Sequence, residues 1–355
     1  MSTEIDYCLE KILGLDSTDE EQNACILQKN ALIPDYLYKY RSLTNNALNN
    51  LRTQTLWFDK PANMNDPYDC RFTVQNLLDQ KCSVEFYKHL FEDQIDVNII
   101  NRLKNESISL RKLIETEPGM MEQALIPTLI KAIDEISEQD HLKFLNKLLN
   151  EVHFCSLSSS YDSMLMWTHY CNEHRGFCIE YDLNNLEKAK NFKGLLYPVK
   201  YSEDLFDITP AMPTSTEISH GIKEMKNGGP LQTKDTKLFM LNPLLHKNIN
   251  WSYEKEWRAI YPFGILKESQ SMQSPKPSAI LLGSNFFNQF DIYERSRDTI
   301  YFGTLSLAFD LLSLCKKNDL EIRFMKNDIK KFRMIYDVMT YDECKQKLIK
   351  LKNAE

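Results

Sequence analysis

Residues 250–261 have the sequence NWSYEKEWRAIY, which is the clearest pattern in this chain of 355 residues. Charged and apolar side chains alternate along it, as they do in a β-strand. Glu254 and Glu256 are two residues apart and would project from one face of that strand, with Trp257 on the other face and Arg258 back on the first.

Two carboxylates held so close raise each other's pKa. They can then divide two roles at a sugar-like substrate, namely stabilising positive charge and activating a nucleophile. Arg258 could counter their charge or hold a phosphate. The same alternation also describes an edge strand with one solvated face, so this pattern alone assigns no function.

Short strand signals and helical periodicities alternate along the rest of the chain. Strands are expected at 36–41, 56–58, 152–157, 176–181, 195–201, 257–261, 279–282, 299–302 and 320–325. Helices are expected from the cap residues Thr18 and Thr44, over 305–317, and from Thr340. This order predicts an α+β fold with a mixed or split β-sheet core.

The same pattern suggests a division of the chain. Residues 1–30 form a helical N-terminal extension, 31–335 an α+β core, and 336–355 a C-terminal helix. The core carries a helical insertion at about 84–150, rich in Lys, Glu, Gln and Leu, and a flexible loop at about 208–234, rich in Pro, Gly, Ser and Thr.

Composition excludes two familiar classes of nucleotide-binding protein. The chain has only 10 glycines, none spaced as G-x-G and none in a G-x-x-x-x-G-K motif, so both the Rossmann fingerprint and the Walker phosphate loop are missing. A formal net charge of -7 argues against a general nucleic-acid-coating role but leaves room for a local basic groove.

Targeting and cysteine patterns favour a cytoplasmic protein. The first ten residues lack the basic start and apolar run of a secretory signal, and no run of eighteen apolar residues predicts a membrane span. The nine cysteines are odd in number and never spaced C-x-x-C, so reduced, buried thiols are expected rather than a disulfide framework.

A cluster of metal-ligand residue types occurs in residues 166–178. His169, Cys171, His174 and Cys178 could supply four donors to zinc, but all four lie within ten residues that run from a helix into a strand. Their side chains should diverge, so packed thiols and hydrogen-bonded histidines are the better interpretation and no metal is expected.

The order of several segments resembles a bacterial family known as domain of unknown function 2971, over roughly residues 36–326. These segments are YKYR at 38–41, LWF at 56–58, NDPYD at 65–69, FCS at 154–156, LMWTHY at 165–170, H-x-GFCIEY at 174–181 and YEKEWR at 253–258.

The succession of an Arg-bearing strand, a Ser-bearing strand and a Glu-x-Glu strand looks like ADP-ribosyltransferases of the Arg-Ser-Glu type. Those enzymes fold as a split β-sandwich and bind NAD in its cleft without a Rossmann fingerprint. By this resemblance Arg41 would hold a phosphate or ribose of NAD, and Ser156, with Ser158 nearby, would support the site. Glu256 would hydrogen-bond the nicotinamide ribose, and Glu254 would orient the acceptor.

The resemblance implies further contacts and a reaction. Tyr38, Tyr40 or Tyr161 could stack on nicotinamide, and Trp167 and His169 join the residues expected around NAD. NAD would be the substrate and would carry its own leaving group, so no metal is needed. The expected activity is ADP-ribosyl transfer to a protein or nucleic-acid acceptor, or NAD hydrolysis, as in bacterial toxins and defence effectors.

Two other classes of function stay open on the sequence. One is a hydrolase or nuclease that uses His169, His174 and Glu180, because a histidine beside a carboxylate can act in acid–base catalysis. The other is a non-enzymatic binding or regulatory module, with the helical insertion as the surface for a protein partner. No membrane partner is expected in either case.

Overall fold

The computed structural model describes residues 3–76, 79, 109, 111–112, 115, 126–184, 186–211, 238–262, 264–290 and 301–353. Its elements confirm an α+β fold built on a mixed sheet of eight strands, in the order β14-β13-β12-β5-β1-β4-β10-β6. Strands β12 and β13 run parallel, and the other neighbouring pairs run antiparallel.

The strands of this sheet are β1 (Tyr36–Arg41), β4 (His153–Ser158), β5 (Phe177–Asp182), β6 (Leu196–Pro198), β10 (Glu256–Tyr261), β12 (Pro277–Leu282), β13 (Glu321–Asn327) and β14 (Met334–Met339). Three small sheets pair β2 (Thr55–Phe58) with β11 (Gln270–Gln273), β3 (Phe72–Thr73) with β8 (Phe206–Asp207), and β7 (Lys200–Ser202) with β9 (His246–Asn248).

The helices are α1 (Thr3–Leu13), α2 (Asp19–Ala31), α3 (Asn45–Thr53), α7 (Ile126–Glu151), α8 (Met164–Tyr170), α9 (Leu186–Leu195), α12 (Tyr301–Lys317) and α13 (Tyr341–Asn353). Short 3-10 segments are η1 (Pro61–Asn63), η3 (Thr209–Ala211), η4 (Phe239–Leu245), η5 (Ile249–Glu254) and η6 (Asn288–Phe290). None of the helices in the described ranges is both apolar enough and long enough to cross a membrane.

Helix starts follow the local chemistry that the sequence predicts. Thr18 and Glu21 form a reciprocal capping box at the start of α2, and the Thr44 hydroxyl accepts a hydrogen bond from the Ala47 backbone at the start of α3. Each cap satisfies backbone N–H groups that have no partner inside the helix.

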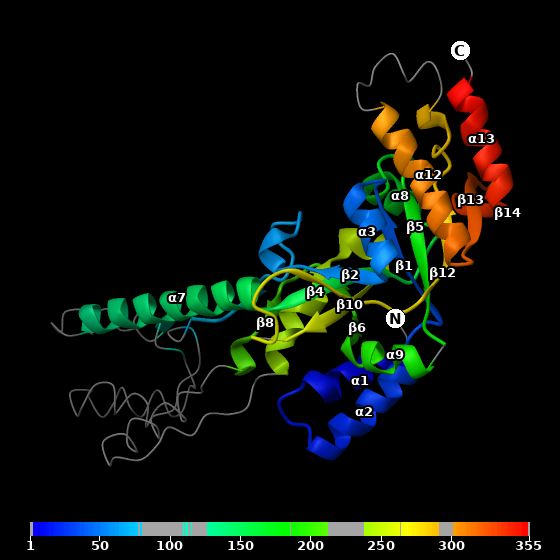
Figure 1. The fold of residues 1–355 in the computed structure, drawn as a ribbon. Coiled ribbons are helices and arrows are strands. Elements are labelled where there is room, and N and C mark those ends of the chain that lie inside the picture. The colour runs from blue at the N-terminus through cyan, green and yellow to red at the C-terminus, as the bar shows by residue number, and fades with distance from the viewer. Residues whose placement is uncertain are drawn as a thin grey trace.

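Alternation along β1 places its side chains in two different cores. Leu37 belongs to the large core that includes residues of α3, α12 and α13, whereas Tyr38 and Tyr40 pack with Trp167 of α8 in a smaller core on the other face. In Figure 1, α3, α12 and α13 lie along the part of the sheet that contains β1, β5 and β12, and α7 projects away from the sheet. The two faces of the sheet therefore belong to separate cores, and α1 and the end of α7 pack on the second face beside Phe154 and Ile260.

The sheet splits between β1 and β4. Only one pair of residues, Tyr38 and Ser158, is aligned between these two strands. Nearer the start of β4, Phe154 forms an isolated antiparallel bridge with Asp59 instead. Between those two points the Lys39 ammonium donates a hydrogen bond to the Ser156 carbonyl at 2.6 Å. A side chain thus satisfies a backbone acceptor that a neighbouring strand would ordinarily satisfy.

A tight turn after α8 is packed between β1 and β12. Asn172, Glu173 and His174 all have positive φ, which is uncommon for residues other than glycine. Three such residues in a row make this turn compact. A Cβ atom at Gly176 would lie 2.2 Å from the Arg41 carbonyl oxygen, and one at Gly283 would lie 2.0 Å from the His174 carbonyl oxygen. Both positions therefore require glycine for close backbone packing.

Some expected elements differ from the structure. The strand expected at 299–302 is wrong at residues 301–302, because α12 begins at Tyr301, and residues 299–300 lie outside the described residues. The strand expected at 195–201 is divided by Val199 into β6 and β7, and β14 was not expected at all.

The helical insertion expected at 84–150 can be followed in α7, while most of 84–125 lies outside the described residues. Of the loop expected at 208–234, residues 208–211 are described, with η3 among them, and the rest lies outside the described residues. In the expected terminal segments the structure has helices α1, α2 and α13.

Candidate active site

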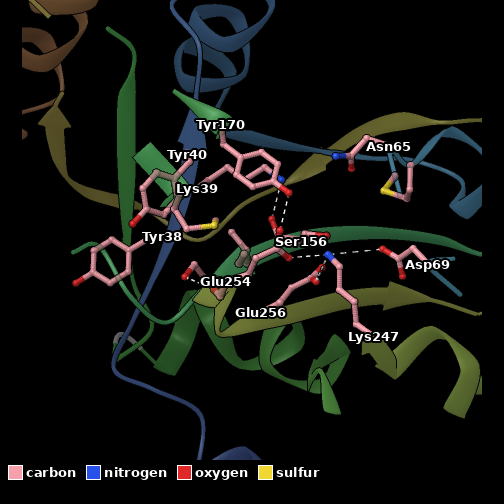
Figure 2. A pocket seen from close by; sticks show the side chains of 14 residues that line it. Tyr38, Lys39, Tyr40, Asn65, Asp69, Ser156, Tyr170, Lys247, Glu254 and Glu256 are labelled. Atoms are coloured by element: carbon pink, nitrogen blue, oxygen red, sulfur yellow. Dashed lines mark hydrogen bonds and ion pairs between the residues drawn. The ribbon is translucent and has the colours of Figure 1, made fainter. Parts of the chain in front are cut away.

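A cavity of about 170 Å³ lies where β1 and β4 separate. The two strands supply one wall through Tyr38, Lys39, Tyr40, Ser156, Leu157 and Ser158, and the opposite wall includes Asp69, Tyr170, Lys247, Glu254 and Glu256. Figure 2 shows these side chains converging from separate elements. Since cavities for whole drug-sized ligands are usually about 300–1,000 Å³, this one has room for only part of such a ligand.

The two glutamates converge by a route that differs from the expected one. They are not successive outward positions of one strand, because Glu254 ends η5 and Glu256 begins β10. Lys255 between them adopts the left-handed conformation, with φ of 44°, and reverses the chain sharply enough to bring both carboxylates inward. The prediction that they meet holds, while the prediction of a continuous strand through 254–256 is wrong.

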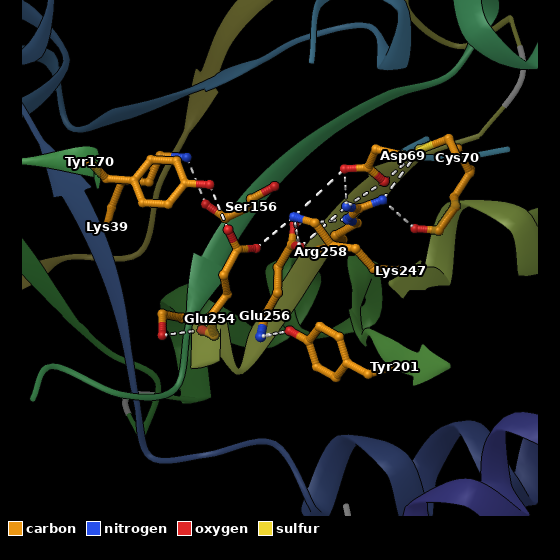
Figure 3. Close-up of polar contacts among 12 residues, drawn as sticks. Lys39, Asp69, Cys70, Ser156, Tyr170, Tyr201, Lys247, Glu254, Glu256 and Arg258 are labelled. Carbon is orange, nitrogen blue, oxygen red and sulfur yellow. Dashed lines mark hydrogen bonds and ion pairs between the residues drawn. The ribbon is translucent and has the colours of Figure 1, made fainter. Parts of the chain in front are cut away.

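A buried network of alternating charge surrounds the two carboxylates (Figure 3). Lys247 contacts both of them, with Nζ at 2.6 Å from Glu254 Oε2 and 3.1 Å from Glu256 Oε2. Arg258 donates from Nε to Glu256 Oε1 at 2.8 Å and from Nη2 to both carboxylate oxygens of Asp69. Each charge is thereby paired, as a fully buried charge must be.

The network shifts the pKa values of the two carboxyl groups in opposite directions. Burial, together with the charge of Glu256, raises the pKa of Glu254, although Lys247 and Tyr170 act in the opposite direction. Burial also acts to raise the pKa of Glu256, but the charges of Arg258 and Lys247 outweigh it and hold that pKa well below its usual range. Divergent pKa values of neighbouring carboxyls are typical of acid–base pairs in active sites.

Neutral hydrogen bonds fix the positions of both glutamates. The Tyr170 hydroxyl donates to Glu254 Oε1 at 2.5 Å, and burial beside that carboxylate raises the pKa of the tyrosine. The Glu256 backbone N–H donates to the Tyr201 hydroxyl at 2.8 Å, and the Ser156 side chain hydrogen-bonds the Glu256 carboxylate. The carboxylates are therefore held in place before any ligand binds.

The structure brings only some of the residues expected around NAD to this cavity. Tyr38, Tyr40 and Ser156 line it, and Arg258 lies directly behind Glu256. Arg41 is a correction, because it is not among the described residues that line the cavity. It follows Leu37 and Lys39 on the face of β1 opposite Tyr38 and Tyr40, at the far end of the strand opposite Phe177.

The other expected contacts lie one layer further out. Trp167 is fully buried and donates from its indole to the Tyr161 carbonyl, and the Tyr161 ring lies 5.5 Å from that of Tyr38. His169 is exposed, 6.2 Å from the Tyr253 ring. Trp167 and Tyr161 therefore support the tyrosine wall, while His169 lies at the outside of the site.

The ligand-type residues of segment 166–178 do not converge. Cys171 and Cys178 are buried against backbone carbonyls, and burial raises the pKa of both thiols. His174 instead contacts Thr168 and Ser284. Across the ranges that the structure describes, no group of three or more His, Cys, Asp or Glu residues is arranged to hold a metal ion.

The acid–base group suggested for a hydrolase is also dispersed. Glu180 accepts hydrogen bonds from Tyr38, Ser278 and Arg323, whereas His174 contacts Thr168 and Ser284. His169 is exposed beside Tyr253. The geometry gives that alternative no shared site.

Four residues of the site were not identified from the sequence: Lys39, Asp69, Tyr170 and Lys247. Lys39, Asp69 and Tyr170 do lie inside segments that carried the family resemblance, which was the available signal. Lys247 lies in no such segment. It is the middle residue of β9, and its contact with Glu256 at the start of β10 depends on the tertiary fold.

Comparison with known proteins gives one finding. Residues 166–259 match the profile of the family described as protein of unknown function (DUF2971), which confirms the expected resemblance over that segment. The matched segment includes Tyr170, Lys247, Glu254, Glu256 and Arg258. No curated protein and no solved structure matches the chain.

Proposed function

We propose that this protein is an NAD-dependent ADP-ribosyltransferase, or an NAD glycohydrolase when water is the acceptor. The observation that supports this most strongly is the position of the acidic pair in a cavity between separating strands. Enzymes of the Arg-Ser-Glu type, which the order of segments resembles, bind NAD in such a split. The cavity volume suits the nicotinamide and its ribose, with the rest of NAD extending outside.

The reaction begins with loss of nicotinamide. The bond between the ribose and the pyridinium nitrogen breaks, its electron pair leaves with nicotinamide, and positive charge develops on the ribose. Glu256 would stabilise that charge, because Arg258 and Lys247 keep its carboxylate ionised. Preorganisation by Ser156 and Arg258 would limit its movement as the charge appears.

Transfer then needs a nucleophile and a proton acceptor. A lone pair of the acceptor forms the new bond to the ribose carbon, and the proton of the acceptor passes to Glu254. The raised pKa of Glu254 suits that role. Lys39, which lines the cavity where Arg41 was expected to act, is the cation best placed to attract the phosphate groups of NAD.

The direct test is release of nicotinamide from labelled NAD by the wild-type protein and by Glu256→Gln. The substitution keeps the size of the side chain but removes the charge, so the rate should fall about a thousandfold. Glu268→Gln is the matched control, because Glu268 is exposed and pairs with Lys60 outside the cavity. Its rate should equal that of the wild type.

A wild-type protein that neither binds nor consumes NAD, with a broad set of macromolecular acceptors supplied, would reject the proposal. Turnover that survives in Glu256→Gln would instead assign charge stabilisation to another residue. Circular dichroism of each variant separates loss of chemistry from loss of folding.

A further inference from the structure

A second hollow, of about 460 Å³, lies beside the candidate active site. We call it the aromatic groove, and it is lined by Asp66, Tyr68, Asn248, Asn250, Trp251 and Tyr253. One side is the loop that follows η1, and the other side is η5 with the residue before it. The proposed reaction makes no use of these six residues.

Flat aromatic surfaces dominate the groove. The rings of Trp251 and Tyr253 lie 6.0 Å apart at an angle of 40°. Tyr68 is 69% exposed, which is unusual for so large a side chain and leaves its ring available to a ligand. Such surfaces bind other flat rings by stacking, at about 1–3 kcal/mol for each base in complexes with single-stranded nucleic acids.

Polar groups in the same groove can hydrogen-bond the edge of a flat ring. Asp66 Oδ1 accepts a hydrogen bond from the Tyr68 backbone, whereas Oδ2 is buried without a partner among the described residues. An unpaired buried carboxylate oxygen is costly unless a ligand supplies a donor. Asn248 and Asn250 add amide groups, which carry both donors and acceptors.

We propose that the aromatic groove binds a nucleobase. A base offers a flat ring that can stack on Trp251, Tyr253 and Tyr68. Its edge carries N–H groups that can donate to Asp66 Oδ2 and acceptor atoms that can receive hydrogen bonds from the asparagine amides. Either an acceptor nucleic acid or the adenine end of NAD can supply that base, since both present the same chemistry.

The groove adjoins the reactive carboxylates through Lys247. The Lys247 ammonium lies 5.2 Å from the centre of the Trp251 ring and 2.6 Å from Glu254 Oε2. Tyr253 of the groove directly precedes Glu254. A base held here would therefore lie next to the carboxyl that accepts the proton. The binding of a base stands on the groove alone, whereas its role as acceptor rests on the proposed function.

The test is a binding titration of the full-length protein with adenosine, cytidine, guanosine and uridine, and with a single-stranded DNA oligonucleotide, followed by tryptophan fluorescence and calorimetry. We expect saturable binding of at least one probe. Trp251→Leu should weaken it at least tenfold, in line with the loss of one stacking partner. Trp57→Leu is the matched control, because Trp57 is 43% exposed on β2 and lies outside the groove.

Asp66→Asn gives a second measurement that does not depend on stacking. The substitution replaces one acceptor with a donor. The affinity for the preferred nucleoside should therefore change by about 5–100-fold, and the order of preference among the four should change with it. Competition with NAD distinguishes the two sources of base. Displacement of the nucleoside by NAD assigns the groove to the adenine end, and displacement by the oligonucleotide alone assigns it to an acceptor.

Three results would overturn the proposal: no binding of any probe at millimolar concentration, equal binding of glucose, or binding that Trp251→Leu and Trp57→Leu affect equally. Nicotinamide release, measured on the same samples, keeps this test separate from that of the proposed function. A wild-type protein that consumes NAD but binds no base would leave the reaction intact and reject only the groove.

Discussion

Lys29 is a buried ammonium group without a carboxylate partner among the interactions that the structure describes. Its side chain is fully buried between α2 and α9, and Nζ donates to the Leu196 carbonyl at 2.6 Å and to the Lys193 carbonyl at 3.3 Å. The charged form loses its hydration there, so burial lowers the pKa of Lys29 to about 7. A lysine that changes charge near neutral pH makes folding stability depend on pH.

We expect the free energy of unfolding to rise with pH because of this residue. Lys29 has a pKa of about 7 in the folded protein against 10.5 for an ordinary lysine, so the unfolded chain binds more protons between those values. The free energy of unfolding should therefore increase between pH 7 and 10 by on the order of 4 kcal/mol less in Lys29→Met than in the wild type.

Urea unfolding of wild type and Lys29→Met, measured across that pH range, checks this prediction. The stability advantage of the variant should be largest at pH 7 and should shrink toward pH 10. Exposed Lys350→Met is the control, and its curve should run parallel to that of the wild type. A parallel curve for Lys29→Met would contradict the prediction.

At the residue scale, the sequence predicts that the two glutamates and Arg258 meet, but it does not predict which other side chains join them. Glu254, Glu256 and Arg258 lie within one short stretch, so their proximity can be inferred from spacing. Asp69 reaches the same network from a segment far away in sequence, and Lys247 reaches it from nine residues before Glu256, but no local pattern links either residue to β10. Arg41 shares a face of β1 with Lys39, which lines the cavity, but it lies at the far end of the strand, and the local sequence does not show where along β1 the cavity ends.

At the element scale, local chemistry predicted the starts of α2, α3 and α13. Caps such as Thr18 and Thr44 act within one turn, so their effect can be read from neighbouring residues. The turn at Lys255 could not be predicted in this way, because lysine has no preference for the left-handed conformation. Tertiary contacts impose that conformation: the Lys255 carbonyl accepts hydrogen bonds from the backbone and hydroxyl of Ser159.

Substitutions at Lys255 should reveal that imposed conformation. Lys255→Val should lower the free energy of unfolding by about 1–2 kcal/mol, because a β-branched side chain clashes at positive φ. Lys255→Gly should change it by less than about 1 kcal/mol, since relief of strain offsets the added freedom of the unfolded chain.

Urea denaturation measures both effects. Lys200→Val on β7 is the control, because valine suits an extended strand and should change stability by less than about 0.5 kcal/mol there. Equal destabilisation by valine and glycine at position 255 would mean that loss of the lysine side chain, and not backbone strain, is the cause.

At the scale of the whole molecule, the class of fold was predictable and the topology was not. Alternating strand and helix signals indicate α+β, but the position of β1 between β5 and β4 results from pairings between distant segments. The separation of β1 from β4, which forms the cavity, leaves no trace in local periodicity. The cavity is therefore a property of the assembled sheet.

The thiols of the folded protein should react slowly. Eight of the nine cysteines are in the described ranges, where all eight are buried and free. Burial raises the pKa of Cys315 to about 12 and that of Cys178 well above its usual value, so little reactive thiolate is present at neutral pH.

Titration with Ellman's reagent checks this. At most one thiol, that of Cys82, should react rapidly in the native protein, and all nine should react in denaturant. Several fast thiols before denaturant is added would show that the cores open readily. Fewer than nine afterwards would indicate a disulfide.

Close backbone packing at Gly176 and Gly283 limits which side chains this fold can accept at those two positions. A single added methyl group at position 176 collides with the carbonyl of Arg41, two residues along β1 from Lys39 at the cavity. At position 283 it collides with the carbonyl of His174 in the neighbouring turn. Alanine at either position should therefore disturb the turn between α8 and β5, and at position 176 it should disturb the end of β1 as well.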